Sequence, residues 1–217
     1  YECGKLVTVA IDNATCSIGE AAFMGCSSLK SIDLGNSITA INKSAFALCT
    51  ALEAIVIPNS VSNIGNFAFS HCDTLTSATF GNSLISIGDY AFSNCRNLTK
   101  TVIPNSTLTI GNWAFGYCDM LDSAVVGISV KSIGDGAFGE CNMLDSVVLL
   151  GHSLKHIGDH AFANCSSIPA ISLPSSVETI GSWAFMGCSS INHITCKAQT
   201  PPAIDSTTWA WTSSVMV

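Results

Sequence analysis

The sequence contains few charged residues and no long apolar segment. Only 11% of its 217 residues are charged, against about 25% in an average soluble protein. The chain has eight Lys and Arg residues and 15 Asp and Glu residues, so it lacks the positive surface that nucleic-acid binding requires. No stretch approaches the roughly 18 consecutive apolar residues of a membrane-spanning helix, and the start does not resemble a signal peptide. We therefore expect neither a nucleic-acid partner nor a membrane span in this segment.

The sequence does contain one motif that recurs throughout its length. Hydrophobic residues make up 48% of the chain, far too many for a disordered segment, and they recur at a spacing of 23 residues, once 24. An Ala-Phe pair marks each unit, with its Phe at Phe23, Phe46, Phe69, Phe92, Phe115, Phe138, Phe162 and Phe185. A cysteine follows three residues later, and the same register includes Cys3: Cys26, Cys49, Cys72, Cys95, Cys118, Cys141, Cys165 and Cys188.

Each unit combines an extended piece with a compact turn. Residues 55–57 alternate so that Ile55 and Ile57 share one face, which predicts a short strand, and a Pro or Gly then ends the strand. A second extended piece covers residues 61–64. A Gly then leads into the Ala-Phe segment, for which we predict a short helical turn capped by a side-chain oxygen. The expected caps are Asn66, Asp89, Asn112, Asp135, Asp159 and Ser182.

A 23-residue unit is too small to bury its own apolar face, whereas stacked units cover one another. The repeat therefore predicts an α/β repeat solenoid with one strand per turn in a parallel sheet. We expect residues 1–217 to form a single domain of about nine repeats that begins and ends inside a repeat. The last repeat, residues 196–217, is degenerate because Thr208 and Trp209 replace the Ala-Phe pair.

The repeats resemble the BspA-like leucine-rich repeats. That family has the pattern I-P-x-S-V-x-x-I-G-x-x-A-F-x-x-C-x-x-L, which residues 57–72 match almost position for position. The resemblance implies a leucine-rich-repeat, right-handed arc with the parallel sheet on its concave face and short helical turns on the other side. It also implies a secreted or surface-attached protein, typically bacterial, that functions in adhesion or protein binding.

The candidate catalytic and metal-binding residues have simpler structural explanations. Cysteines in one register of a solenoid should stack as buried, reduced packing residues rather than form disulfides or a tetrahedral metal site. His152, His156 and His160 lie four residues apart, but the repeat places them on different sides of one turn. No nucleophile elbow, phosphate loop or dinucleotide motif is present. We therefore predict no catalytic residue, no metal site, no cofactor and no enzymatic activity.

Two surface rows remain as candidate binding sites. The outward side of the strands is β-branched and nearly uncharged, which suits a protein partner or reflects strand propensity alone; its candidates are Val56, Thr79, Val102, Val125 and Val148. The position two before each Phe is often aromatic, which suits a glycan platform or shields the turns; its candidates are Phe67, Tyr90, Trp113 and Trp183.

The sequence thus predicts a non-enzymatic adhesion or protein-binding module at a cell surface, presenting a rigid concave surface to a protein, matrix or host-surface partner. A carbohydrate-binding module that uses the aromatic row is the first alternative. A passive spacer within a larger surface protein is the second.

Overall fold

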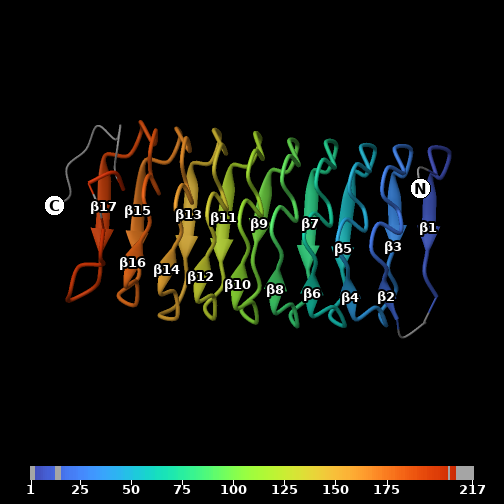
Figure 1. Ribbon diagram of the computed structural model, residues 1–217, viewed down its shortest axis with the longest axis horizontal. Helices are drawn as coiled ribbons and strands as arrows, with labels where there is room; N and C mark the ends of the chain where they lie inside the picture. Colours follow the sequence, from blue (N-terminus) through green and yellow to red (C-terminus); the bar gives the residue numbers. More distant parts are fainter. Residues whose placement is uncertain (1–2, 13–15, 205, 209–217) are drawn as a thin grey trace.

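The computed structural model describes residues 3–12, 16–204 and 206–208, which form a solenoid of stacked turns (Figure 1). Each turn except the last described one contributes one longer and one two-residue strand, and the described residues contain no helix. The long strands are β1 (Thr8–Ala10), β3 (Ser31–Asp33), β5 (Ala54–Ile57), β7 (Ser77–Phe80), β9 (Lys100–Val102), β11 (Ser123–Val126), β13 (Ser146–Leu149), β15 (Ala170–Leu173) and β17 (His193–Cys196). The short strands are β2 (Ser17–Ile18), β4 (Ala40–Ile41), β6 (Asn63–Ile64), β8 (Ser86–Ile87), β10 (Thr109–Ile110), β12 (Ser132–Ile133), β14 (His156–Ile157) and β16 (Thr179–Ile180).

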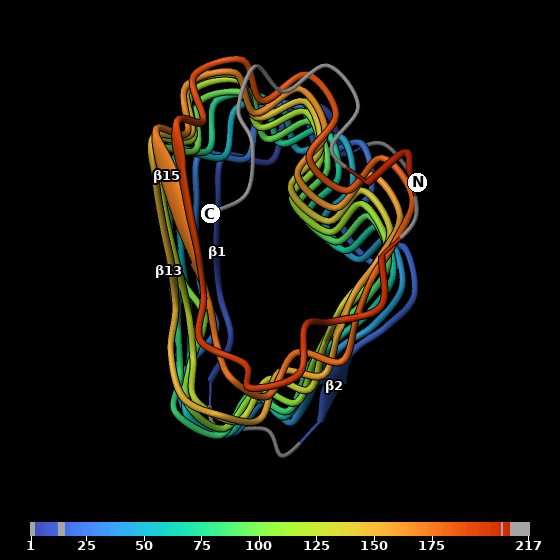
Figure 2. The ribbon, with the colours of Figure 1, turned by 90° about the vertical axis from the view of Figure 1, so that its left-hand side faces the viewer.

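The two sets of strands form separate parallel sheets on opposite sides of the turn, as the view along the rod shows (Figure 2). The short strands form one continuous sheet from β2 to β16. The long strands form three groups, β1–β3, β5 to β13 and β15–β17. The predicted parallel solenoid is therefore confirmed, but the prediction of one strand per turn is wrong, because a second, two-residue strand forms in all but the last described turn. Residues 23 apart face one another across the strand pairs, as Val56 faces Thr79, except between β12 and β14, where the paired residues are 24 apart.

The Ala-Phe segment of each turn is not helical, so the predicted short helical turns are wrong. The amides of Phe67, Phe69 and His71 donate to carbonyls of the next turn at 2.7 to 2.9 Å, and the amides between them bond within their own turn. Phe67 and His71 have φ values of 59°. An α-helix needs consecutive right-handed residues whose amides bond four residues back, so this alternating backbone excludes one.

The expected helix caps connect neighbouring turns instead. The Oδ1 atom of Asn66 accepts the amide of Asp89 at 2.9 Å, and that of Asp89 accepts the amide of Asn112 at 2.8 Å. The same bond recurs from Asn112, Asp135 and Asp159 to residues one turn on. These side chains therefore bind turn to turn along the rod, and the cap assignment is corrected.

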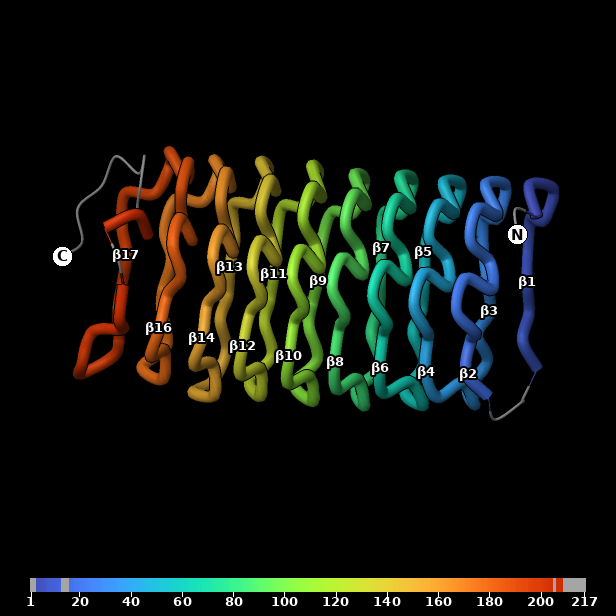
Figure 3. The backbone as a smooth tube through the Cα atoms, in the orientation of Figure 1, coloured from blue at the N-terminus to red at the C-terminus, as the bar shows by residue number. Residues whose placement is uncertain are grey.

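The interior is filled by residues that stack on their counterparts in neighbouring repeats, and the tube in Figure 3 shows closely similar paths in successive central turns. The eight rings of the Ala-Phe pairs stack in one column, with centroids 5.0 to 5.4 Å apart and interplanar angles of 2° to 9°. All of them except Phe23 are fully buried. Beside them, the Sγ atom of Cys95 lies 3.2 Å from the carbonyl oxygen of Phe69, and the other buried cysteines from Cys49 to Cys188 repeat this contact. The predicted burial is confirmed for the eight cysteines of this register from Cys26 to Cys188, whereas Cys3, in the first turn, is exposed.

Two departures from the regular repeat lie toward the C-terminus. The one extra residue falls beside Gly151, where the ladder between β13 and β15 is interrupted. In the degenerate last repeat, Thr208 is fully buried and its carbonyl accepts the amide of Phe185 at 3.1 Å. Trp209 lies outside the described residues.

Candidate binding surface

The outward side chains of the nine long strands form one surface, here called the long-strand face. Val56 and Val102 are its most exposed apolar residues, at 64% and 61%, and Val148 is 41% exposed. Strand register places Val125 directly between Val102 and Val148. The predicted protein-binding residues therefore lie on one sheet, with Val56 and Thr79 paired on one side and three valines in a row on the other.

The charge of this face is concentrated at two positions. Lys100 is the only Lys or Arg in the described long strands, and Asp33 is the only acidic residue there. Serines occupy the positions on either side of Lys100, Ser77 on β7 and Ser123 on β11. The face thus presents hydroxyl and apolar groups around a single central cation.

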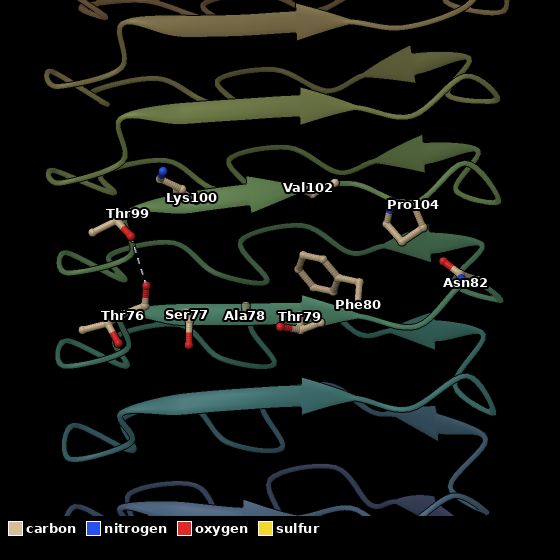
Figure 4. Close-up of a pocket in the computed structure, with 10 residues that line it drawn as sticks. All are labelled: Thr76, Ser77, Ala78, Thr79, Phe80, Asn82, Thr99, Lys100, Val102 and Pro104. Atoms are coloured by element: carbon tan, nitrogen blue, oxygen red, sulfur yellow. Dashed lines mark hydrogen bonds between the residues drawn. The ribbon is translucent and has the colours of Figure 1, made fainter.

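A groove interrupts this face between β7 and β9. Its volume is about 410 Å³, and it is lined by residues 76–80, 82, 99, 100, 102 and 104. The close-up shows the Phe80 ring between the two strands and Lys100 near the other end of the groove (Figure 4). Sequence reasoning missed this groove, although Ala78 and Thr101 already departed from the aliphatic residues of other repeats.

The predicted aromatic row is not continuous. Phe67 and Tyr90 stack with centroids 4.8 Å apart and planes 2° apart. Trp113 instead stacks on Tyr117 of its own turn, at 5.5 Å and 14°. A Cβ atom at Gly136 would lie 2.3 Å from the Trp113 indole, so the absence of a side chain at Gly136 leaves room for that ring.

The remaining aromatic candidate, Trp183, lies apart from this group and packs against His160, with centroids 5.2 Å apart. The Phe67 and Tyr90 rings cover one another, and the Trp113 indole lies over the backbone of Gly136. A glycan platform requires uncovered ring faces. A glycan site on this row therefore stays a prediction, with less geometric support than the long-strand face has.

The three closely spaced histidines have different neighbours. His156 Nδ1 lies 2.8 Å from Thr179 Oγ1, and His152 Nδ1 lies 3.2 Å from Ser175 Oγ, while His160 packs on Trp183. The predicted separation around the turn is confirmed. Among the residues that the structure describes, no group of three or more His, Cys, Asp or Glu side chains could hold a metal ion.

Seven of the buried thiols are held in their protonated form. Burial raises the pKa of Cys49 and of Cys188 to about 12, because ionisation would place a charge in the apolar interior. Burial also raises the pKa of Cys26, Cys72, Cys95, Cys118 and Cys165. Buried thiols with raised pKa values are poor nucleophiles, so these residues are suited to packing rather than to catalysis.

Comparison with known proteins agrees with this architecture. A leucine-rich repeat protein of T. pallidum shares 34% sequence identity over 76% of this chain and 79% of its own, with a TM-score of 0.71. A leucine-rich cell surface protein of Faecalibacterium prausnitzii A2-165 shares 24% identity over 92% of this chain and 75% of its own, with a TM-score of 0.43. No curated protein matches the sequence.

The family assignment rests on a sequence pattern that covers most of the chain. The pattern for the BspA type leucine rich repeat region, in six copies, matches residues 1–122 and 120–208. None of the described residues forms a helix long and apolar enough to cross a membrane. The chain belongs to the BspA-type leucine-rich repeat family.

Proposed function

We propose that this chain is a non-enzymatic binding module of a secreted or cell-surface protein, and that its long-strand face binds a protein partner. One observation carries the proposal: Val56, Val102 and Val148 are exposed on adjoining parts of one sheet. Exposed apolar patches commonly mark interaction sites. Membership in a leucine-rich repeat family supports the same role.

Rigidity of the face supports binding as well. Each strand of the central group is hydrogen-bonded to its neighbours, and the Phe column and the Asn/Asp bonds hold successive turns in register behind it. A preformed surface loses little conformational freedom when a partner binds, so more of the contact energy remains as affinity.

The test is a pair of charges placed in the valine row. We expect Val102→Asp with Val125→Asp to abolish saturable binding to cultured epithelial cells and to immobilised matrix proteins, with circular dichroism unchanged. The matched control is Met120→Asp with Met143→Asp, which adds the same charge to exposed residues one turn apart outside the strands. Unchanged binding by the valine variant would reject the proposal. A parent protein that binds neither cells nor matrix would support the spacer alternative.

A further inference from the structure

The groove between β7 and β9 lies where the strand ladder is weakest within the central group. These strands share one register pair, Ser77 with Lys100, whereas the other neighbouring pairs of this group share three or four. Two side chains at this point are unusual. Phe80 is an aromatic residue where its counterparts in adjacent turns, Ile57 and Ile103, are aliphatic. Thr101 is buried with no hydrogen-bonding partner for its Oγ1 atom among the described residues.

One half of the groove is apolar. The Phe80 ring, 9% exposed, packs edge-on against Phe92 at 5.5 Å, so it cannot turn outward without loss of that contact. Ala78, Val102 and Pro104 also line this half. A volume of about 410 Å³ lies within the range of small-ligand pockets, and it is suited to a few side chains rather than to a folded domain.

The other half of the groove carries a cation with polar neighbours. Lys100 projects from the start of β9, and Thr76, Ser77 and Thr99 line the same half of the groove (Figure 4). Within the described part of the chain, no carboxylate lies within 4.0 Å of its ammonium group, whereas Lys43 and Lys155 each have such a partner. The Lys100 charge is therefore available to an anionic group of a ligand.

The spacing of the two halves defines the ligand. Lys100 and Val102 are two residues apart on one strand, so their side chains point to the same side, about 7 Å apart. An extended peptide presents its side chains i and i+2 with the same direction and spacing. We propose that this groove binds an extended peptide segment of the partner, with a carboxylate side chain on Lys100 and an aliphatic side chain, two residues away, on Phe80 and Val102. The inference rests on the proposed protein-binding function and adds the chemistry of the bound segment.

Selection from a phage-displayed random heptapeptide library on the immobilised full chain tests the proposal. We expect enriched peptides to share Asp or Glu with Val, Ile or Leu two positions away. The same selection on Lys100→Glu should enrich Lys or Arg instead of the acid, because the charge of the groove is reversed. Lys131→Glu, an exposed lysine outside the strands, is the matched control and should select the same acidic peptides as the parent.

Affinity of one selected peptide, made synthetically, gives the quantitative result. We expect binding to weaken at least tenfold in Lys100→Glu and to remain unchanged in Lys131→Glu, measured by titration calorimetry. Enriched peptides without an acid, or equal affinity for both variants, would overturn the inference. Failure to enrich any peptide would also overturn the inference. The proposed function would still be supported in that case if the parent protein bound cells or matrix proteins saturably and the Val102 and Val125 variant did not. Binding of an acidic glycan that depends on Lys100, without any shared motif among the peptides, would show that the ligand of the groove is a glycan and not a peptide.

Discussion

The two sides of each turn are built differently. On the Ala-Phe side, the same residue types recur at the same positions, and stacked rings, thiols and Asn or Asp side chains connect successive turns. On the long-strand side, the outward residues vary, the sheet divides into three groups, and a groove opens between β7 and β9. The comparison indicates that stability is concentrated on the regular side, which leaves the long-strand face free to vary with the partner.

The largest expected effect is a loss of folding stability at alkaline pH, which comes from the buried thiols of the regular side. Unfolded thiols ionise near pH 9, whereas the folded pKa of Cys49 and Cys188 is about 12. Stability from burial of these thiols is fully present below pH 9 and is lost as pH rises toward 12, by up to about 1.4 kcal/mol per pH unit for each thiol. Urea unfolding between pH 7 and pH 11 under reducing conditions measures this loss. Cys118→Ala should show a shallower decline, and a flat profile to pH 11 would contradict the comparison.

A cavity in the Phe column should have the next largest effect. Phe115 is fully buried between Phe92 and Phe138, with ring centroids 5.3 and 5.4 Å away. We expect Phe115→Ala to lower the free energy of unfolding by about 3–5 kcal/mol. Val102→Ala, on the exposed face, should change it by less than about 0.5 kcal/mol. Urea titration of both proteins measures the difference, and similar losses would show that the two sides are equally important for stability.

Thr101 offers a smaller test of the irregular side. Its buried hydroxyl has no partner among the described residues, so Thr101→Val should raise the free energy of unfolding by about 1–2 kcal/mol. Thr107 is the matched control because its Oγ1 atom, also buried, donates to the Leu84 carbonyl at 2.9 Å. Thr107→Val should therefore lower stability by about 1 kcal/mol. A loss in both variants would show that Thr101 is satisfied in solution.

The sequence predicted what depends on periodicity. The strands, their parallel stacking and the buried Phe and Cys positions all follow from apolar residues that recur every 23 residues. These predictions are confirmed except in the first turns, where Cys3 is exposed and Phe23 is partly buried. The extra residue is visible in the sequence as the single spacing of 24, and the structure shows it beside Gly151, just after the end of β13.

The turn conformation was not predictable in the same way. Left-handed φ values occur two positions before and two after the Phe, at residues such as Trp113 and Tyr117, where Gly would have been the usual signal. The Asn and Asp side chains were read as helix caps because capping is their commonest local role. Their partners lie one turn away, which only the three-dimensional fold reveals. The groove depends on the size of Phe80 relative to the residues around it. The repeat pattern alone does not predict the surface shape that results.

The hydrogen bonds that join successive turns have a mechanical consequence. These hydrogen bonds lie parallel to the long axis of the rod, whereas the chain winds around that axis. Tension applied to the two ends of the chain therefore acts on the hydrogen bonds of one terminal turn at a time. Under tension the rod should therefore extend as whole turns unfold from one end. Each turn that unfolds releases 23 residues, about 80 Å of extended chain. A molecule of this kind, held between a surface and a partner, would lengthen in steps before its central turns gave way.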